Sequence, residues 1–212
     1  MQPRHVILGV LIAVVWGSNF VFIQMSIQEI PPIALCAIRF FLGGVPLVFF
    51  MRRPEVPWSL LLLYSFFTFA LHFAFLFLGM QAGVSAGIAS LLGQMQVFFS
   101  FILASIFLGE SLSRYQFIGT CIAFIGVLIV LEHLGGSDIT LKGFLWILAA
   151  SLAWGAGNLC IKKMHQTQGM RLIVWSCALA CPPLFITSYF IDGPTALYTA
   201  LHSLSWHGAL AV

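Results

Sequence analysis

Residues 10–25 read VLIAVVWGSNFVFIQM, and residues 147–164 read ILAASLAWGAGNLCIKKM. In both stretches a Trp-Gly pair is followed closely by an asparagine, and Trp154 lies about 138 positions after Trp16. A pattern that returns at a fixed distance indicates an internal repeat. The sequence therefore predicts that the chain contains two copies of one structural unit.

The composition assigns both copies to a membrane. Of all residues, 61% are hydrophobic and only 7% are charged, too few charges to cover a soluble core. A helix needs roughly 20 apolar residues to cross a bilayer core of about 30 Å. The chain offers seven apolar stretches that could each cross once, and an eighth that begins near Trp206. The seven are Val6–Met25, Ile33–Phe50, Trp58–Leu78, Ala86–Leu108, Phe117–Leu131, Phe144–Ile161 and Leu172–Ile191.

Lysine and arginine predict the orientation, because positive charges near helix ends stay on the cytoplasmic side. With a cytoplasmic N-terminus, only Lys142 falls outside and Arg39 lies within a span. The remaining seven basic residues near span ends fall inside: Arg4, Arg52, Arg53, Arg114, Lys162, Lys163 and Arg171. This bias supports the number of spans.

The two repeat copies then run in opposite directions, since five helices separate their starts. Inverted repeats are typical of secondary transporters, whose substrate site lies near the midplane between the halves. We expect that site at Trp16, Asn19, Trp154 and Asn158. The first repeat is expected over residues 1–136 and an incomplete second repeat over 137–212, because a full copy requires roughly 60 further residues.

Other classes of binding site find no support in the sequence. The formal net charge is +3, but the basic residues form no stripe for nucleic acid. The five cysteines lie inside apolar segments without a CxxC pair, so we expect no metal, no cofactor and no disulfide. They are Cys36, Cys121, Cys160, Cys177 and Cys181.

Several longer motifs together resemble a known family. They are WGSNFVFIQ (16–24), PPIALCAIRFFLGGVPLVFF (31–50) with RRPEVP (52–57), GIASLLGQMQVFFSFILASIFLGESLSRYQFIG (87–119) and WGAGNLCIKK (154–163). These resemble the EamA family of the drug/metabolite transporter superfamily. Within it, the pattern is most similar to the branch that exports O-acetylserine and cysteine.

The resemblance implies an all-α membrane protein with ten transmembrane helices in two inverted five-helix units and with cytoplasmic termini. About seven and a half of those helices would be present here. It also implies export of small metabolites across a bacterial inner membrane, by alternating access around a midplane site. Lipid and a small-molecule substrate are the expected partners, and a homodimer stays open.

Arg39 is the one cation expected deep in a span, where charge is costly and usually functional. Its guanidinium could pair with an amino-acid carboxylate in a fork geometry. The structural alternative is an arginine that binds carbonyls freed by Pro46 and holds two helices together.

Four other groups are candidates for the substrate site. The asparagine amides of Asn19 and Asn158 could bind both charges of a zwitterion while the indoles close the cavity; alternatively they bond helices together. Gln94 shares a helix with Gln96, but residues two apart face nearly opposite sides, so at most one faces the cavity. His72 could relay a proton, or it donates to a neighbouring backbone group.

Competing functions are weaker. No carboxylate lies deep in a span, which disfavours a proton-coupled cation antiporter, and Arg39 alone is too little for a nucleotide-sugar or other organic-anion carrier. A membrane enzyme is disfavoured because GVSAG, residues 83–87, matches GxSxG only at a helix entrance. A non-transporting membrane subunit or an inactive fragment stays open because the second repeat is incomplete.

Overall fold

The computed structural model describes residues 3–111, 113–133, 140–164 and 169–202, and this part of the chain is helical, with no strand in it. The all-α prediction is confirmed. The elements are α1 (Pro3–Ser26), α2 (Pro32–Val48), α3 (Trp58–Tyr64), η1 (Ser65–Leu71), α4 (His72–Gln81), α5 (Ala86–Gly93), α6 (Met95–Leu108), α7 (Arg114–His133), α8 (Leu141–Met164), α9 (Gly169–Ile191) and α10 (Ala196–His202).

The long helices follow the apolar stretches of the sequence. Within the described residues, five segments are long and apolar enough to cross a membrane, and two further apolar helices are shorter. The five are Arg4–Ser26, Trp58–Gln81, Ala86–Leu108, Leu141–Met164 and Gly169–Ile191; the two are Pro32–Val48 and Arg114–Ile129. These seven segments coincide with the seven predicted stretches. The eighth, expected from Trp206, lies outside the described residues.

Proline and glycine mark where several helices begin and end. Pro32 opens α2, where its missing N–H costs no hydrogen bond. Gly109 ends α6 with a φ of +66°, a left-handed conformation in which glycine has no steric penalty. The apolar runs are therefore delimited by backbone chemistry as well as by hydropathy.

Two of the seven segments are not regular α-helices, a feature that hydropathy does not predict. The segment from Trp58 to Gln81 contains η1, a π-helical run that ends immediately before His72. The segment from Ala86 to Leu108 is interrupted at Gln94, which separates α5 from α6. At this interruption the Leu92 carbonyl accepts a hydrogen bond from the Ser151 hydroxyl of α8, at 3.2 Å.

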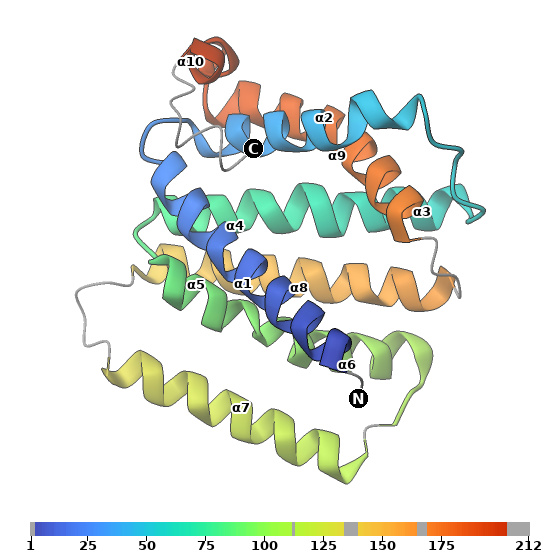
Figure 1. The fold of residues 1–212 in the computed structure, drawn as a ribbon. Helices are drawn as coiled ribbons and strands as arrows, with labels where there is room; N and C mark the ends of the chain where they lie inside the picture. Colours follow the sequence, from blue (N-terminus) through green and yellow to red (C-terminus); the bar gives the residue numbers. More distant parts are fainter. Residues whose placement is uncertain (1–2, 112, 134–139, 165–168, 203–212) are drawn as a thin grey trace.

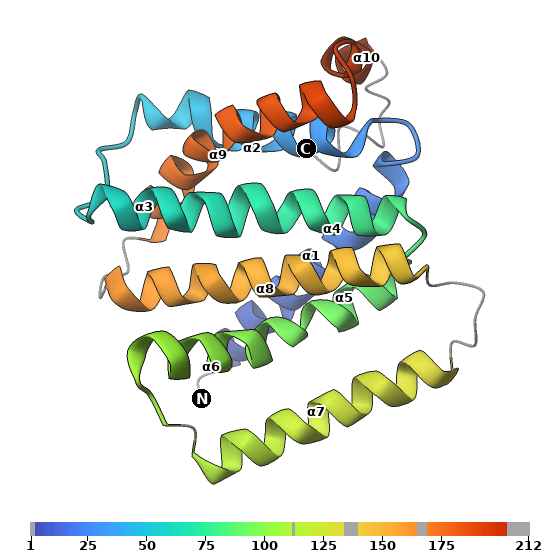
Figure 2. The same ribbon diagram turned by 180° about the vertical axis from the view of Figure 1, so that it is seen from behind.

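The helices stack in layers (Figure 1). In Figures 1 and 2, α2 and α9 lie together below α10, followed by α3–η1–α4, then α8, then α5 and α6, and α7 at the bottom, while α1 crosses several layers. The ends carrying Arg4, Arg53, Arg114, Lys162 and Arg171 lie on one side of this stack, at the right of Figure 1. These five basic residues therefore lie at one end of the bundle.

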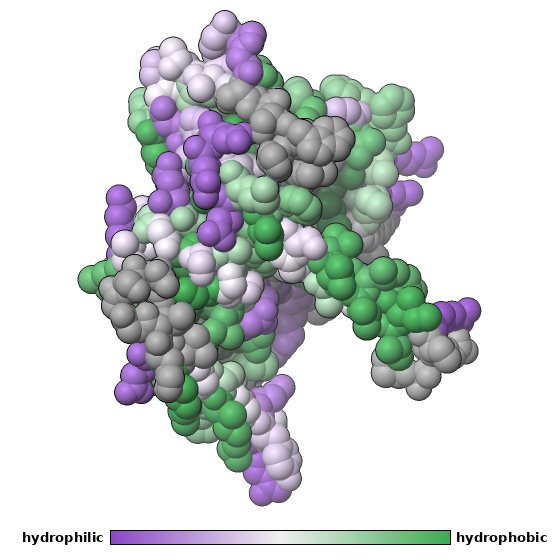
Figure 3. All heavy atoms as spheres, turned by 60° about the vertical axis from the view of Figure 1, so that its left-hand side comes forward, coloured by the Kyte–Doolittle hydropathy of each residue, from purple (hydrophilic) through white to green (hydrophobic). Residues whose placement is uncertain are grey.

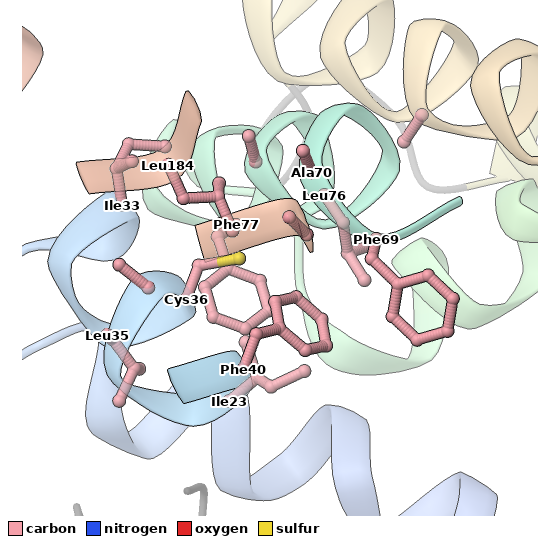
Figure 4. Packing of buried hydrophobic residues seen from close by; sticks show 14 of the residues in the cluster. Ile23, Ile33, Leu35, Cys36, Phe40, Phe69, Ala70, Leu76, Phe77 and Leu184 are labelled. Atoms are coloured by element: carbon pink, nitrogen blue, oxygen red, sulfur yellow. The ribbon is translucent and has the colours of Figure 1, made fainter. Parts of the chain in front are cut away.

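The most extensive helix–helix contact is between α2 and α9, and α2 also packs on α4. Figure 4 shows Cys36 and Phe40 of α2 facing Phe77 of α4, whose side chain is fully buried. The helices α2 and α9 approach each other so closely that a Cβ atom on Gly44 would lie 2.5 Å from the Ala178 backbone nitrogen. Small residues permit this approach, which drives helix association within lipid.

Candidate functional site

Arg39 lines a cavity of about 400 Å³ on the side of the bundle where α1 crosses α2 and α4. We call this cavity the Arg39 pocket. Its lining residues are Leu11, Ile12, Val15, Trp16, Asn19, Arg39 and Phe73. Three predicted site residues, Trp16, Asn19 and Arg39, thus share one cavity, although they come from two different helices.

The guanidinium of Arg39 rests on an aromatic ring rather than on a carboxylate. Its central carbon lies 5.3 Å from the centroid of Phe73, a distance typical of a cation–π interaction. Its Nη1 atom is buried and has no hydrogen-bond partner among the described residues. Among the described residues, Nη1 therefore makes no hydrogen bond to the carbonyls that Pro46 leaves free. The guanidinium keeps donor capacity for a ligand.

Trp154 joins the two repeat motifs at the edge of the pocket. Its ring meets that of Trp16 edge to face, with the centroids 5.8 Å apart. It also meets the His72 ring at 4.7 Å. Aromatic edge-to-face contacts of this kind stabilise packing beyond the area they bury. The Trp-Gly motifs of α1 and α8 therefore touch, although 138 positions separate their tryptophans.

His72 makes the backbone contact that the sequence offered as its alternative to a proton relay. Its Nδ1 atom lies 2.8 Å from the Ala150 carbonyl oxygen, which assigns the proton to Nδ1 because a carbonyl only accepts. The imidazole also touches the ring of Phe73, at 4.8 Å between centroids. His72 thus orients the aromatic wall of the Arg39 pocket, and the proton relay stays a prediction.

The two remaining predicted site residues lie away from the Arg39 pocket. Gln94 is exposed and faces a largely apolar groove of about 660 Å³ between α6 and α7. Asn158 donates a hydrogen bond of 3.0 Å to the Ser100 hydroxyl of α6. It lines a separate cavity of about 180 Å³, formed by Ser100, Phe101, Ala104, Glu110, Ser111, Gln116, Asn158, Leu159 and Lys162. We call this second space the vestibule cavity.

Sequence reasoning missed Phe73, Glu110 and Lys162. Phe73 is one of 21 phenylalanines, and the π-helical run before it shifts its face away from that of a regular helix. Lys162 counted only toward orientation and Glu110 toward no site, yet the two form an ion pair at the mouth of the vestibule cavity. Their separation of 52 positions gave no local signal.

No group of His, Cys, Asp and Glu in the described residues is arranged to hold a metal ion. The Arg39 pocket instead offers a cation on an aromatic floor, an amide and the Trp16 indole around a space that can hold a small molecule, with Trp154 packed behind Trp16. A carboxylate could accept charge-assisted hydrogen bonds from Arg39, which are stronger than neutral ones.

Comparison with known proteins gives a family and several relatives. The profile described as "EamA-like transporter family" matches residues 4–132. A protein of Escherichia coli strain K12, named "Probable amino-acid metabolite efflux pump", is 39% identical over 209 residues, which cover 96% of this chain and 69% of that protein. A Salmonella typhimurium protein with the same name is 39% identical over 198 residues, 91% of this chain and 66% of that protein.

More distant similarity extends to other bacteria. An uncharacterized transporter of Bacillus subtilis is 27% identical over 220 residues, which cover 97% of this chain and 75% of that protein. No solved structure matches the chain significantly. The chain spans about two thirds of the length of the two efflux-pump relatives.

Proposed function

Because the chain belongs to the EamA-like transporter family, we propose that it exports small metabolites across the bacterial inner membrane, with amino acids or derivatives such as cysteine and O-acetylserine as cargo. It is a multi-pass membrane protein, and its family and relatives indicate a transporter rather than an enzyme. The names of the two efflux-pump relatives support metabolite export.

Arg39 carries the proposal. A guanidinium with an unpartnered, buried Nη1 in a mid-helix cavity is costly unless a ligand or a neighbour compensates it. The described neighbours supply an aromatic face but no anion. We assign Arg39 to the carboxylate of the cargo, with Asn19 as the neighbouring amide and Trp16 with Trp154 as an amphipathic wall. His72 supports that wall through Trp154 and Phe73.

The proposed mechanism is alternating access between two inverted repeats, over residues 1–136 and 137–212. Two contacts support it. The equivalent tryptophans Trp16 and Trp154 touch each other. In addition, α2 packs on α9, and these two helices are equivalent because α2 follows α1 in the chain and α9 follows α8. Contacts between equivalent elements are what a two-fold relation between repeats produces. With the basic end facing the cytoplasm, cargo would enter there and leave from the opposite end.

The test is efflux of radiolabelled cysteine and O-acetylserine from cells that express the chain, and from cells that express a form extended to the length of its relatives. We expect Arg39→Ala to lower efflux about tenfold or more, because one charge-assisted hydrogen bond is worth more than 1.4 kcal/mol. Arg39→Lys should recover part of it, since the charge remains but the fork is lost.

Arg53→Ala is the matched control, because Arg53 also lies over an aromatic ring, 4.6 Å from Trp58, but at the basic end of the bundle. It should leave efflux unchanged at equal membrane abundance. Inserted protein of both lengths that moves neither solute contradicts the proposed cargo. An Arg39→Ala variant as active as Arg53→Ala contradicts the role of Arg39.

A further inference from the structure

The vestibule cavity lies between α6 and α8, close to where α7 begins, at the basic end of the bundle. Its volume is about 180 Å³, the volume that about six water molecules occupy at roughly 30 Å³ each. An amino acid with a small side chain is in this size range. In contrast to the Arg39 pocket, this cavity contains one charge of each sign.

The polar groups of the vestibule cavity form a sequence in depth along α8. Lys162, Asn158 and Trp154 are spaced four residues apart and therefore lie on one stripe of that helix. Each step of four residues advances about 6 Å. The stripe thus leads from the charged mouth, past the Asn158–Ser100 hydrogen bond, to the Trp154–Trp16 contact at the Arg39 pocket.

The ion pair at the mouth is easily exchanged. Lys162 and Glu110 are bonded to each other, yet their side chains are 52% and 46% exposed. Exposed pairs contribute little to stability, because water solvates both charges and two long side chains must be held in place. A molecule that carries both an ammonium and a carboxylate can replace each partner at little cost.

We infer that the vestibule cavity is a second binding site and that it is selective for small zwitterionic metabolites. These metabolites occupy it before they reach the Arg39 pocket. Lys162 binds the carboxylate and Glu110 binds the ammonium, while the amide of Asn158 bonds the part that enters deeper. This inference rests on the proposed function for its direction of transport, but binding at this site can be measured without transport.

Three ligands distinguish the two charges. Cysteine is zwitterionic, cysteamine keeps the ammonium without a carboxylate, and 3-mercaptopropionate keeps the carboxylate without an ammonium. Binding of each to the purified chain in detergent is measured by displacement of radiolabelled cysteine and by calorimetry. The measurements are made in the parent and in an Arg39→Ala background, so that the Arg39 pocket does not contribute in the second series.

We expect both Glu110→Gln and Lys162→Gln to weaken cysteine binding about tenfold, since each removes one charge-assisted contact. Glu110→Gln should leave 3-mercaptopropionate binding unchanged, and Lys162→Gln should leave cysteamine binding unchanged. Lys163→Gln is the matched control, because it removes the same charge from the neighbouring exposed position. It should alter none of the three affinities.

A purely structural ion pair would make Glu110→Gln and Lys162→Gln indistinguishable across the three ligands, and that result overturns the inference. So does an Arg39→Ala chain that elutes as a single species but binds no cysteine, O-acetylserine or other amino acid, while the parent binds them. In that case the proposed function stands. Opposite selectivity of the two variants, with no export by the chain or by its extended form, upholds the vestibule site and overturns the proposed function instead.

Discussion

The helices α1 and α2 are both apolar and adjacent in the chain, yet they have opposite surroundings. Half of the residues in α2 are buried, and Gly44 nearly touches the backbone of α9. Of the apolar stretch within α1, only 6% is buried. Figure 3 shows the apolar surface of α1 standing away from the body of the molecule. Hydropathy therefore identifies helices for a membrane but does not say which of them pack.

The difference also describes the Arg39 pocket, which lies between these two helices. One wall, from α2 and α4, is fixed by close packing; the other, from α1, carries Trp16 and Asn19 and is 53% exposed at Trp16. Lipid solvates exposed apolar side chains, so exposure costs α1 little. A site built from one rigid and one lightly held wall can change volume without disturbing the core.

The largest expected effect comes from filling the space at Gly44. Gly44→Val places its Cβ within 3 Å of Cys177 and Ala178 and should cost about 3 kcal/mol or more, because backbone cannot yield. Gly43→Val is the matched control, since a Cβ there meets nothing within 4 Å. The measurement is the fraction of folded protein in detergent as temperature rises. Equal midpoints for the two variants would contradict the tight α2–α9 packing.

A smaller effect is expected where α8 meets η1. A Cβ on Gly157 would lie 1.9 Å from the Thr68 hydroxyl oxygen, which is buried without a hydrogen-bond partner among the described residues. Gly157→Ala should therefore destabilise by about 1–3 kcal/mol. Thr68→Ala should relieve most of that loss, which a double-mutant cycle measures. Additive effects of the two changes would show that the residues do not touch.

A still smaller effect, dependent on pH, is expected at Asp192, just beyond the end of α9. Burial raises the pKa of this carboxyl, although hydrogen bonds from the Ala34 N–H, at 2.7 Å, and the Ser188 hydroxyl oppose the rise. The folded state then holds the proton more tightly than the unfolded state does, so stability is higher at low pH and declines as pH rises through the folded-state pKa.

Asp192→Asn keeps an acceptor for Ala34 and removes the titration. We expect the free energy of unfolding to change by about 1 kcal/mol or less at neutral pH. We also expect the unfolding midpoint of the variant to depend less on pH than that of the parent. The parent and the variant are compared by thermal unfolding from acid to neutral pH. Parallel curves for the two proteins would mean that Asp192 is not responsible for the dependence.

The smallest effect should arise in α1. A Cβ on Gly17 meets nothing within 4 Å, so Gly17→Ala should change stability by no more than about 0.5 kcal/mol, as at other unpacked surface positions. A clear destabilisation, measured beside Gly43→Ala, would show that α1 is covered by another surface in the membrane.

Much of the fold could be predicted from the sequence because lipid imposes one simple requirement, an apolar run of sufficient length. The all-α class and the seven helical stretches followed from it. The break at Gln94 and the π-helical run at Ser65–Leu71 did not, because neither changes hydropathy.

The candidate site was predicted in part for a similar reason. Trp16 and Trp154 were found because the repeat pairs them, and Arg39 because charge is rare in a span. Asn158 was assigned to the same cavity by analogy with Asn19, but it stands one residue further from its tryptophan than Asn19 does. That offset directs it toward Ser100 and the vestibule cavity instead.

The π-helical run gives the site a dependence on chain length. A π-helix holds more residues per turn than an α-helix, and His72 and Phe73 follow it directly. If this run closed into a regular α-helix at the same length, everything beyond it would turn by roughly 100° or more, because each residue of an α-helix turns about 100° and each residue of a π-helix turns less. His72 would then face away from Ala150, and Phe73 away from Arg39. Loss of one residue from the run would cancel most of that turn, so the pocket should tolerate such a deletion better than a return to α-helical hydrogen bonding at full length, although neither change alters a residue that lines it.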